Sequence, residues 1–204
     1  MQWQELDIEG AWLITPTRYE DDRGFFVETF RAEEFEEHVG HPFHLQQANM
    51  SVSKAGVVRG VHYADVPPSQ AKYVSCTRGA IVDYVVDIRA GSPTFGKWTS
   101  VLLNSAQPRF VYISEGLGHA LIALEDHTTV NYLVSESFNP KREHGVQALD
   151  AALGLEFPAT DSSGRPLEIL LSPKDAEAPL LADALAAGLL PTYEESVAYR
   201  ASLT

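Results

Sequence analysis

Five side chains that could carry out proton-transfer chemistry occur in β-rich parts of the sequence. Arg59 and His62 share one such segment, Lys72 follows it closely, His119 comes after a glycine-rich turn, and Tyr132 lies in a β-branched run. A histidine can accept a proton from carbon next to a ketone while fixed cations stabilise the resulting enolate, and a tyrosine on the other face can return a proton. These residue types predict such a site if the fold brings them into one pocket.

The alternation of side chains along a strand decides whether these five residues can point into one pocket. Side chains two residues apart share a strand face, so Lys72 and Tyr132 each share a face with apolar neighbours and are expected to point inward. Arg59 and His62 are three residues apart, and regular alternation would send them to opposite faces. A β-bulge at Gly60 would turn both inward, since glycine inside a strand often marks a bulge.

Each candidate also has a plain structural interpretation. His62 could be a hydrogen-bonded core histidine, Tyr132 a packing aromatic, and any single cation a surface partner of a carboxylate. Double-stranded β-helix folds often bind a metal through two histidines one residue apart, but His62 has no such neighbour, so we expect no metal and no cofactor.

Cys76 is the sole cysteine. It excludes an intrachain disulfide, and we expect it to be buried as a small hydrophobe.

The length of 204 residues suits one domain, and most of the chain shows the pattern of short strands separated by turns. This pattern predicts a mainly β fold, either a sandwich, a jelly roll or a barrel. The expected strands are Ala11–Thr15, Phe25–Phe30, Val57–His62, Lys72–Cys76, Ile81–Ile88, Trp98–Leu103, Arg109–Ile113, Ala120–Leu124 and Thr128–Val134. Helical spacing predicts helices at Arg31–Val39, Pro179–Leu190 and Tyr193–Arg200, packed outside the β core.

The charge balance narrows the class of partner. The chain has 28 acidic and 15 basic residues and a net charge of −13, which argues against nucleic acid and anionic membranes. It has no run of 18 apolar residues and no apolar N-terminal leader, so we expect a soluble, cytoplasmic protein. If Arg23, Arg59, Lys72, His119 and Lys174 converge, they would form a local cationic pocket for a small anion such as a nucleotide diphosphate.

Seven motifs, in order along the chain, together carry a family resemblance. They are Asp22-Arg23-Gly24-Phe25-Phe26, Gln47-Ala48-Asn49, Val58-Arg59-Gly60-Val61-His62, Gln70-Ala71-Lys72, Gly91-Ser92-Pro93-Thr94-Phe95-Gly96, Gly118-His119 and Leu171-Ser172-Pro173-Lys174-Asp175. From about residue 1 to 190 the chain resembles the dTDP-4-dehydrorhamnose 3,5-epimerase family. The resemblance implies a cupin-type jelly roll (double-stranded β-helix), no metal or nicotinamide cofactor, and a dTDP-linked 4-keto-6-deoxyhexose as substrate.

The resemblance also implies a homodimer that exchanges N-terminal strands. Residues 1–50 would supply these strands, 51–160 the jelly-roll core, and 161–204 a C-terminal segment with helices. Apolar residues in the first part give this expectation a physical basis, because a monomer would have difficulty burying all of them. They are Trp3, Leu6, Ile8, Trp12, Ile14, Phe25 and Phe26.

Residue roles follow from the same resemblance. His62 is similar to the family's general base, Asp175 to the carboxylate that orients it, Tyr132 to the acid, and Lys72 to the group that steadies the enolate. Contacts to the diphosphate and sugar are implied for Arg59, His119 and Lys174. Contacts to the rest of the nucleotide sugar are implied for Arg23, Glu28, Gln47, Asn49 and Glu143, with Arg23 serving the partner subunit's site.

The reaction itself stays open at this point. The loop Gly116–Leu121 and Asn131 differ from the common pattern of rhamnose-pathway members and resemble relatives from antibiotic deoxysugar pathways, some of which invert C3 alone. The alternatives are therefore epimerisation of dTDP-4-keto-6-deoxyglucose at both C3 and C5, or at C3 only. A 3,4-ketoisomerase, a non-catalytic sugar-nucleotide binding protein and a metal-dependent oxygenase of the same fold are further alternatives.

Overall fold

The computed structural model describes residues 1–203, which form mostly short strands. The strands are β1 (Gln2–Glu5), β2 (Ala11–Thr15), β3 (Arg18–Asp21), β4 (Gly24–Val27), β5 (Gln47–Ser53), β6 (Val58–Ala64), β7 (Lys72–Arg78), β8 (Ala80–Val86), β9 (Trp98–Asn104), β10 (Phe110–Ile113), β11 (Gly118–Ala123), β12 (Thr128–Val134) and β13 (Glu143–Gly145). The helices are α1 (Ala32–Val39), α2 (Pro173–Ala176), α3 (Leu181–Ala186) and α4 (Tyr193–Ala201). None of these helices has the length and apolarity needed to cross a membrane.

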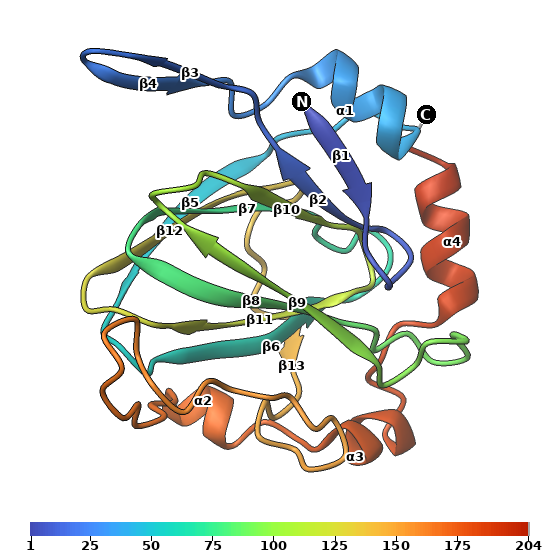
Figure 1. The fold of residues 1–204 in the computed structure, drawn as a ribbon. Coiled ribbons are helices and arrows are strands. Elements are labelled where there is room, and N and C mark those ends of the chain that lie inside the picture. The colour runs from blue at the N-terminus through green and yellow to red at the C-terminus, as the bar shows by residue number, and fades with distance from the viewer. Residues whose placement is uncertain (204) are drawn as a thin grey trace.

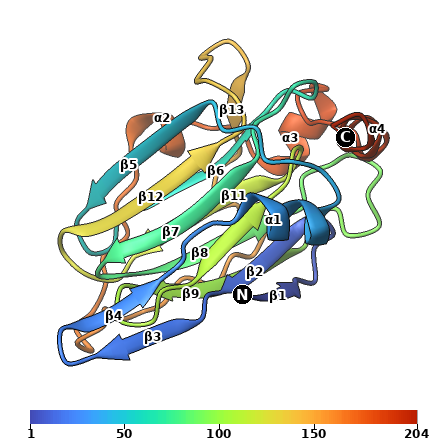
Figure 2. The ribbon, with the colours of Figure 1, turned by 90° about the horizontal axis from the view of Figure 1, so that it is seen from above.

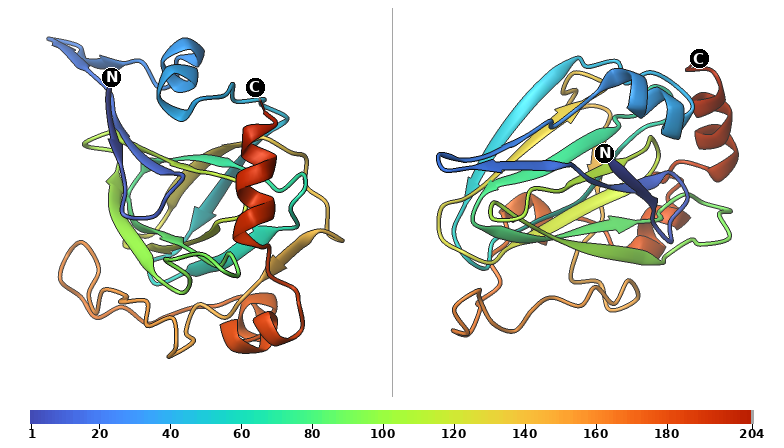
Figure 3. Two further views of the ribbon diagram at one scale, coloured as in Figure 1. Left: turned by 90° about the vertical axis from the view of Figure 1, so that its right-hand side faces the viewer. Right: turned by 45° about the horizontal axis from the view of Figure 1, so that its top comes forward.

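Two antiparallel sheets face each other and form the body of the molecule (Figure 1). One sheet has the strand order β1-β2-β10-β7-β12-β5, and the other has the order β13-β6-β11-β8-β9. A separate hairpin of β3 and β4 projects from the body (Figures 1 and 3). Paired antiparallel sheets of this kind make a jelly roll, so the predicted fold class is confirmed.

The apolar core lies in three layers. Between the sheets, one cluster includes Val74 and Val85. On the outer face of the six-stranded sheet, a second cluster includes Phe35 of α1, and Figure 2 shows α1 lying against this sheet. On the outer face of the five-stranded sheet, a third cluster joins Tyr84 to Leu181 of α3. The C-terminal segment therefore covers one sheet while α1 covers the other.

The predicted helices are present, and local sequence explains where they begin and end. α1 ends at Gly40, whose φ of +91° is the left-handed conformation that glycine adopts most easily. α4 begins at Thr192 with a capping box, in which Thr192 and Glu195 satisfy each other's backbone N–H groups. α3 is shorter than the predicted span because the chain turns at Gly188, where φ is +66°. α4 then runs across one end of the strands (Figure 3).

The predicted strands are also present, apart from shifts at their ends, but the pattern does not predict β1, β3, β5 or β13. The largest correction to a predicted strand concerns β4, which ends at Val27. Beyond it Phe30 leaves the strand and packs edge-on against Tyr73 with ring centroids 5.4 Å apart. Only the first part of the predicted strand Phe25–Phe30 is therefore a strand of the hairpin, and Phe30 instead packs the connecting loop against the six-stranded sheet.

β5 shows why one strand escapes prediction. Its side chains alternate, but the inward-facing residues Gln47, Asn49 and Ser51 are polar, while Met50 and Val52 face outward and are 67% and 53% exposed. A strand normally turns its apolar side to the core. This reversed polarity hides the strand from a hydrophobic pattern, and it places polar side chains inside the jelly roll.

Some of the N-terminal apolar residues expected to need a partner are covered within the chain itself. Ile8 and Ile14 are buried in the chain's own core. Trp3 packs edge-on against Trp12 and against Phe35 of α1. β2 pairs with β10 of the same chain. Within residues 1–50, large apolar side chains remain exposed on the β3–β4 hairpin, namely Tyr19, Phe25 and Phe26, and farther along at Leu45 and Met50.

Candidate active site

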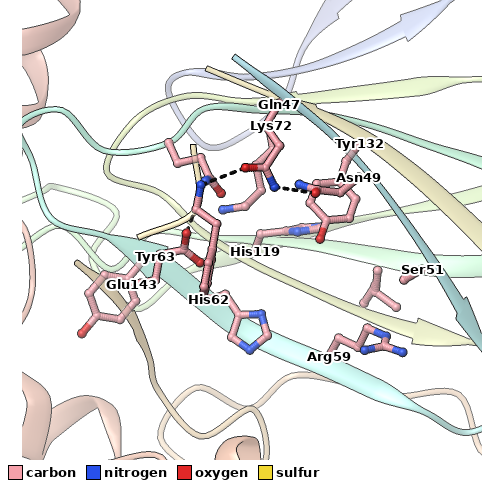
Figure 4. Close-up of a pocket in the computed structure, with 13 residues that line it drawn as sticks. Gln47, Asn49, Ser51, Arg59, His62, Tyr63, Lys72, His119, Tyr132 and Glu143 are labelled. Atoms are coloured by element: carbon pink, nitrogen blue, oxygen red, sulfur yellow. Dashed lines mark hydrogen bonds between the residues drawn. The ribbon is translucent and has the colours of Figure 1, made fainter. Parts of the chain in front are cut away.

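A polar cavity of about 270 Å³ opens between the two sheets (Figure 4). It is lined by Gln47, Asn49, Ser51, Arg59, His62, Tyr63, Gln70, Lys72, His119, Leu121, Tyr132, Phe138 and Glu143. The structure thus brings together the five side chains whose chemistry the sequence singles out. They come from both sheets, so groups from opposite walls face the same space.

A bulge in β6 allows Arg59 and His62 to point into the cavity together. On the neighbouring strand, His119 pairs with His62 and Leu121 pairs with Arg59, so two residues of β6 lie opposite one residue of β11. Gly60 in the bulge has a φ of +118°, and a Cβ there would lie 2.4 Å from the carbonyl oxygen of His119. Only glycine fits this close approach. The predicted bulge is confirmed.

His62 is held by a carboxylate from the C-terminal segment. Its Nε2 lies 2.6 Å from Oδ1 of Asp175, and Ser172 Oγ donates to Oδ2 of the same carboxylate at 2.8 Å. Burial raises the pKa of Asp175, but the hydrogen bonds from His62 and Ser172 outweigh it and hold this pKa below its ordinary value. Asp175 does not line the cavity. It lies behind His62 and fixes the orientation of the imidazole.

Lys72 enters the cavity from β7 and is buried. Burial lowers the pKa of its amine to about 8, although the charges of Glu143, Asp83 and Glu115 oppose this shift. Across residues 1–203, no hydrogen bond or ion pair to its ammonium group is found. A buried cation without a direct partner is available to an oxyanion of a ligand.

Tyr132 approaches the cavity from β12, in the sheet opposite to that of His62. The phenol is half-buried, and this burial raises its pKa above the ordinary value. The hydroxyl therefore keeps its proton at neutral pH. A protonated phenol on one wall and an imidazole on the other can act on opposite faces of a ligand held between them.

His119 on β11 pairs with a carboxylate that the sequence analysis misses. Its Nε2 lies 2.6 Å from Oδ1 of Asp83, whose side chain is fully buried in β8. The other oxygen, Oδ2, has no hydrogen-bond partner in the described structure. A single charge in the otherwise apolar and aromatic strand Ala80–Val86 is the signal that could have identified it.

Polar side chains complete the wall near β5 and β13. Gln47 donates to Oδ1 of Asn49 at 2.6 Å and accepts from the backbone N–H of Phe138 at 3.0 Å. Glu143 accepts from Gln70 at 3.4 Å. The sequence analysis predicts Gln47, Asn49 and Glu143 but not the remaining lining residues. Those are Ser51, Tyr63, Gln70, Leu121 and Phe138.

Three predicted contact residues do not reach the cavity of their own chain. Arg23 pairs with Asp21 at 2.5 Å in the exposed turn of the β3–β4 hairpin. Glu28 pairs with Arg31 near the start of α1. Lys174 is exposed on α2 and does not line the cavity. Their implied contacts to the nucleotide sugar, including that of Arg23 at the partner subunit's site, therefore stay predictions.

Comparisons with known proteins agree with the fold and the cavity. Residues 5–183 match the family model described as dTDP-4-dehydrorhamnose 3,5-epimerase. A protein of that name from Mycolicibacterium smegmatis is 54% identical, covering 98% of this chain and 95% of the relative. The structure of Mycobacterium tuberculosis rmlC epimerase superposes with a TM-score of 0.94 at 47% identity, over 100% of both chains.

A further solved structure extends the comparison. It is a double mutant of ChmJ, a 3'-monoepimerase from Streptomyces bikiniensis, in complex with dTDP. It is 43% identical to this chain, covers 98% of this chain and 97% of its own, and has a TM-score of 0.92. The extent of these matches confirms the cupin-type jelly roll and the resemblance read from the sequence motifs. The chain belongs to the dTDP-4-dehydrorhamnose 3,5-epimerase family.

Proposed function

We propose that this chain is an isomerase that epimerises dTDP-4-keto-6-deoxyglucose at C3 and C5. The observation that carries the proposal is the placement of His62 and Tyr132 on opposite sheets, with the ammonium group of Lys72 in the same cavity. The 54% identical relative is named a 3,5-epimerase, which favours inversion at both carbons. Both carbons flank the C4 ketone, so the same groups can act on each in turn.

The reaction begins with proton transfer to His62. Its imidazole takes the hydrogen of C3 as a proton, and the electron pair of the C–H bond moves toward the C4 oxygen to give an enolate. Lys72 stabilises the charge on that oxygen; groups of this kind typically lower the barrier by about 2.7–4 kcal/mol each. Tyr132 then delivers its proton to C3 from the opposite face, and the ketone forms again with the centre inverted. Once His62 has released its proton to solvent and Tyr132 has taken one up, the same steps at C5 give the second inversion.

The remaining lining residues suit the nucleotide part of the substrate. Arg59 and His119 offer donors to the diphosphate and sugar, while Gln47, Asn49 and Glu143 offer polar contacts beyond them. The ChmJ structure contains dTDP, and its two substitutions replace a histidine by asparagine and a tyrosine by phenylalanine. The same pair of residue types, His62 and Tyr132, faces the cavity here, which supports a shared mode of binding.

Proton NMR in D2O tests the proposal directly. We expect that incubation of dTDP-4-keto-6-deoxyglucose with the protein replaces hydrogen by deuterium at both C3 and C5. Deuterium at C3 alone would identify a 3-epimerase. Exchange at neither carbon, with the nucleotide sugar still bound in calorimetry, would indicate a binding protein and contradict the proposal.

The Asp175→Asn variant should retain substrate binding and lose turnover by a factor on the order of 100. The amide keeps the shape of the side chain but cannot stabilise the imidazolium that forms when His62 accepts a proton. Steady-state kinetics and calorimetry with dTDP measure the two effects separately. Unchanged turnover would show that Asp175 does not assist His62.

The activity should fall as the pH rises through about 8, where Lys72 loses its proton. The cation is present below this pKa and absent above it, so the loss should appear as the alkaline limb of kcat/KM for the free enzyme. Tyr132, whose pKa is raised, ionises only at higher pH. A Lys72→Met variant should lack the limb and be slower by roughly 10²- to 10³-fold. A wild-type profile that stays flat well above this pH would refute the role of Lys72.

We also propose that two chains form a homodimer through the β3–β4 hairpin. β1 and β2 already pair within the chain, so the exchanged element is the hairpin, not the first two strands. Its apolar residues Tyr19 and Phe26 are exposed at 61% and 68%. A groove between the hairpin and the outer face of the six-stranded sheet supports this proposal, since Phe25 and Leu133 line it. The exposed hairpin turn, where Arg23 pairs with Asp21, would then lie toward the partner's cavity.

Light scattering at micromolar concentration should give twice the mass of one chain. Replacing both Tyr19 and Phe26 by serine should shift the protein toward monomer, because the exposed apolar surface that favours association is removed. Leu102→Ser is the matched control, since Leu102 is also an exposed apolar residue but lies on β9 of the other sheet. A monomeric and fully active wild-type protein would contradict the dimer.

A further inference from the structure

Asp83 occupies a place in the core where an apolar residue is expected. It lies between Ile81 and Val85 on the inward face of β8, and both neighbours belong to the apolar cluster between the sheets. Its side chain is fully buried, and only Oδ1 has a partner, the Nε2 atom of His119 at 2.6 Å. Burying a carboxylate oxygen without a hydrogen bond is costly. The fold therefore retains an unfavourable group next to the cavity.

The buried carboxylate of Asp83 and the ammonium group of Lys72 belong to the two facing sheets. Asp83 faces inward from the five-stranded sheet, and Lys72 faces inward from the six-stranded sheet opposite. The charge of Asp83 is one of three that oppose the effect of burial on the amine of Lys72. No direct ion pair joins the two residues among the residues that the structure describes. The attraction therefore acts through space across the cavity.

Two further carboxylates act on Lys72: the effect of Glu143 is larger than that of Asp83, and the effect of Glu115 is smaller. Glu143 on β13 is half-buried and accepts hydrogen bonds from Gln70 and the backbone of Asn139. Glu115 beyond β10 accepts a hydrogen bond from Ser135, and burial raises the pKa of its carboxyl group. The remaining titratable groups that line the cavity are Arg59, His62 and Tyr63 on β6, His119 on β11 and Tyr132 on β12.

We propose that Asp83 is a positioning residue with two functions, in which Oδ1 fixes His119 and Oδ2 sustains the positive charge of Lys72. One buried carboxylate thus prepares two groups on the cavity wall before the substrate binds. A neutral Lys72 could not stabilise the enolate, and an unrestrained imidazole could turn away from its ligand. The inference rests on the proposed epimerase chemistry for its meaning, but the charge state of Lys72 can be measured without any reaction.

The test is an NMR titration of the 204-residue chain with 13C-labelled lysine side chains. The chain has lysines at positions 54, 72, 97, 141 and 174 only, so the Lys72 signal can be assigned as the one missing from Lys72→Met. In Asp83→Asn, the pKa of Lys72 should fall by about one unit relative to wild type, because a nearby opposite charge is lost. An unchanged Lys72 titration in a folded Asp83→Asn protein would overturn the proposal.

Kinetics give a second readout. The alkaline limb of kcat/KM should move to lower pH by about one unit in Asp83→Asn, so its activity relative to wild type should be several-fold lower at pH 8 than at pH 6. Asp175→Asn is the control, since it should slow turnover without moving this limb. A purely structural role of Asp83 would lower activity equally at both pH values, and this result would also overturn the proposal.

A second variant keeps the proposal testable if Asp83→Asn does not fold. In His119→Gln, the carboxylate loses its imidazole partner and its full charge can act on Lys72, so the pKa of Lys72 should rise. A fall or no change would contradict the inference. If no nucleotide sugar is turned over by the wild-type protein but the Lys72 titration shifts as expected in these variants, the proposed function fails while the link between Asp83 and Lys72 stands.

Discussion

Replacing His62 by asparagine should abolish deuterium exchange at C3 and C5 and lower kcat by about 10²- to 10⁴-fold. Asparagine has nearly the same reach as histidine, but its amide cannot accept a proton at a useful rate. In the proposed reaction no bond to carbon breaks before this transfer, so exchange and inversion should disappear together. NMR in D2O measures exchange, and chromatography of the nucleotide sugars measures inversion.

The fold and the binding of dTDP should survive this change. His62 is partly exposed, and its hydrogen bond to Asp175 joins it to the C-terminal segment without contributing to the apolar core. Thermal unfolding and calorimetry are the controls. Deuterium uptake at the wild-type rate in a folded His62→Asn protein would show that another group removes the proton.

The Tyr132→Phe variant should separate proton removal from proton return. His62 and Lys72 remain, so the substrate should still exchange its C3 hydrogen with solvent, whereas formation of the inverted product should fall by roughly 10²-fold or more. The substitution keeps the volume of the ring, so a tyrosine that served only in packing would tolerate it. A time course in D2O that records labelled substrate and labelled product in the same sample measures both steps.

The surroundings of Tyr132 in the six-stranded sheet should tolerate this substitution, so a loss of inversion can be assigned to the missing hydroxyl. Tyr132 is opposite Asn49 on β5 and Val74 on β7 in the strand register, and phenylalanine can occupy the same position. Arg59 and His119 should still bind the nucleotide, so dTDP affinity should change little. Normal inversion together with normal binding would show that Tyr132 is structural and that water or another group returns the proton.

Much of the fold could be predicted because the strands between the sheets follow a simple alternation. β12 has the bounds Thr128–Val134 that its β-branched pattern predicts. The bulge at Gly60 could also be predicted, since only an irregular strand turns Arg59 and His62 to the same side. In each case a local steric rule decides the outcome, and such rules can be read from a short segment.

The parts that could not be predicted depend on contacts between distant segments. The residue motifs identify His62 and Asp175 through family resemblance, but no spacing rule connects positions 113 residues apart. The lone charge in its apolar strand marks Asp83 as unusual, but the sequence does not show that it pairs with His119. The N-terminal apolar residues show the same limit, because composition does not reveal that β2 pairs with β10 and buries Ile14.

β5 joins the substrate cavity to the outer surface through a single stretch of backbone. Its polar side supplies Gln47 and Asn49 to the cavity, while Met50 and Val52 lie on the other side. If this edge strand slipped by one residue along β12, every side chain would change faces, and apolar groups would enter the cavity as amides left it. A register shift of one residue in β5 would therefore remove both the polar contacts in the cavity and the apolar surface on the outside. Correct registration of one strand is thus a joint requirement for ligand recognition and for the surface presented to other molecules.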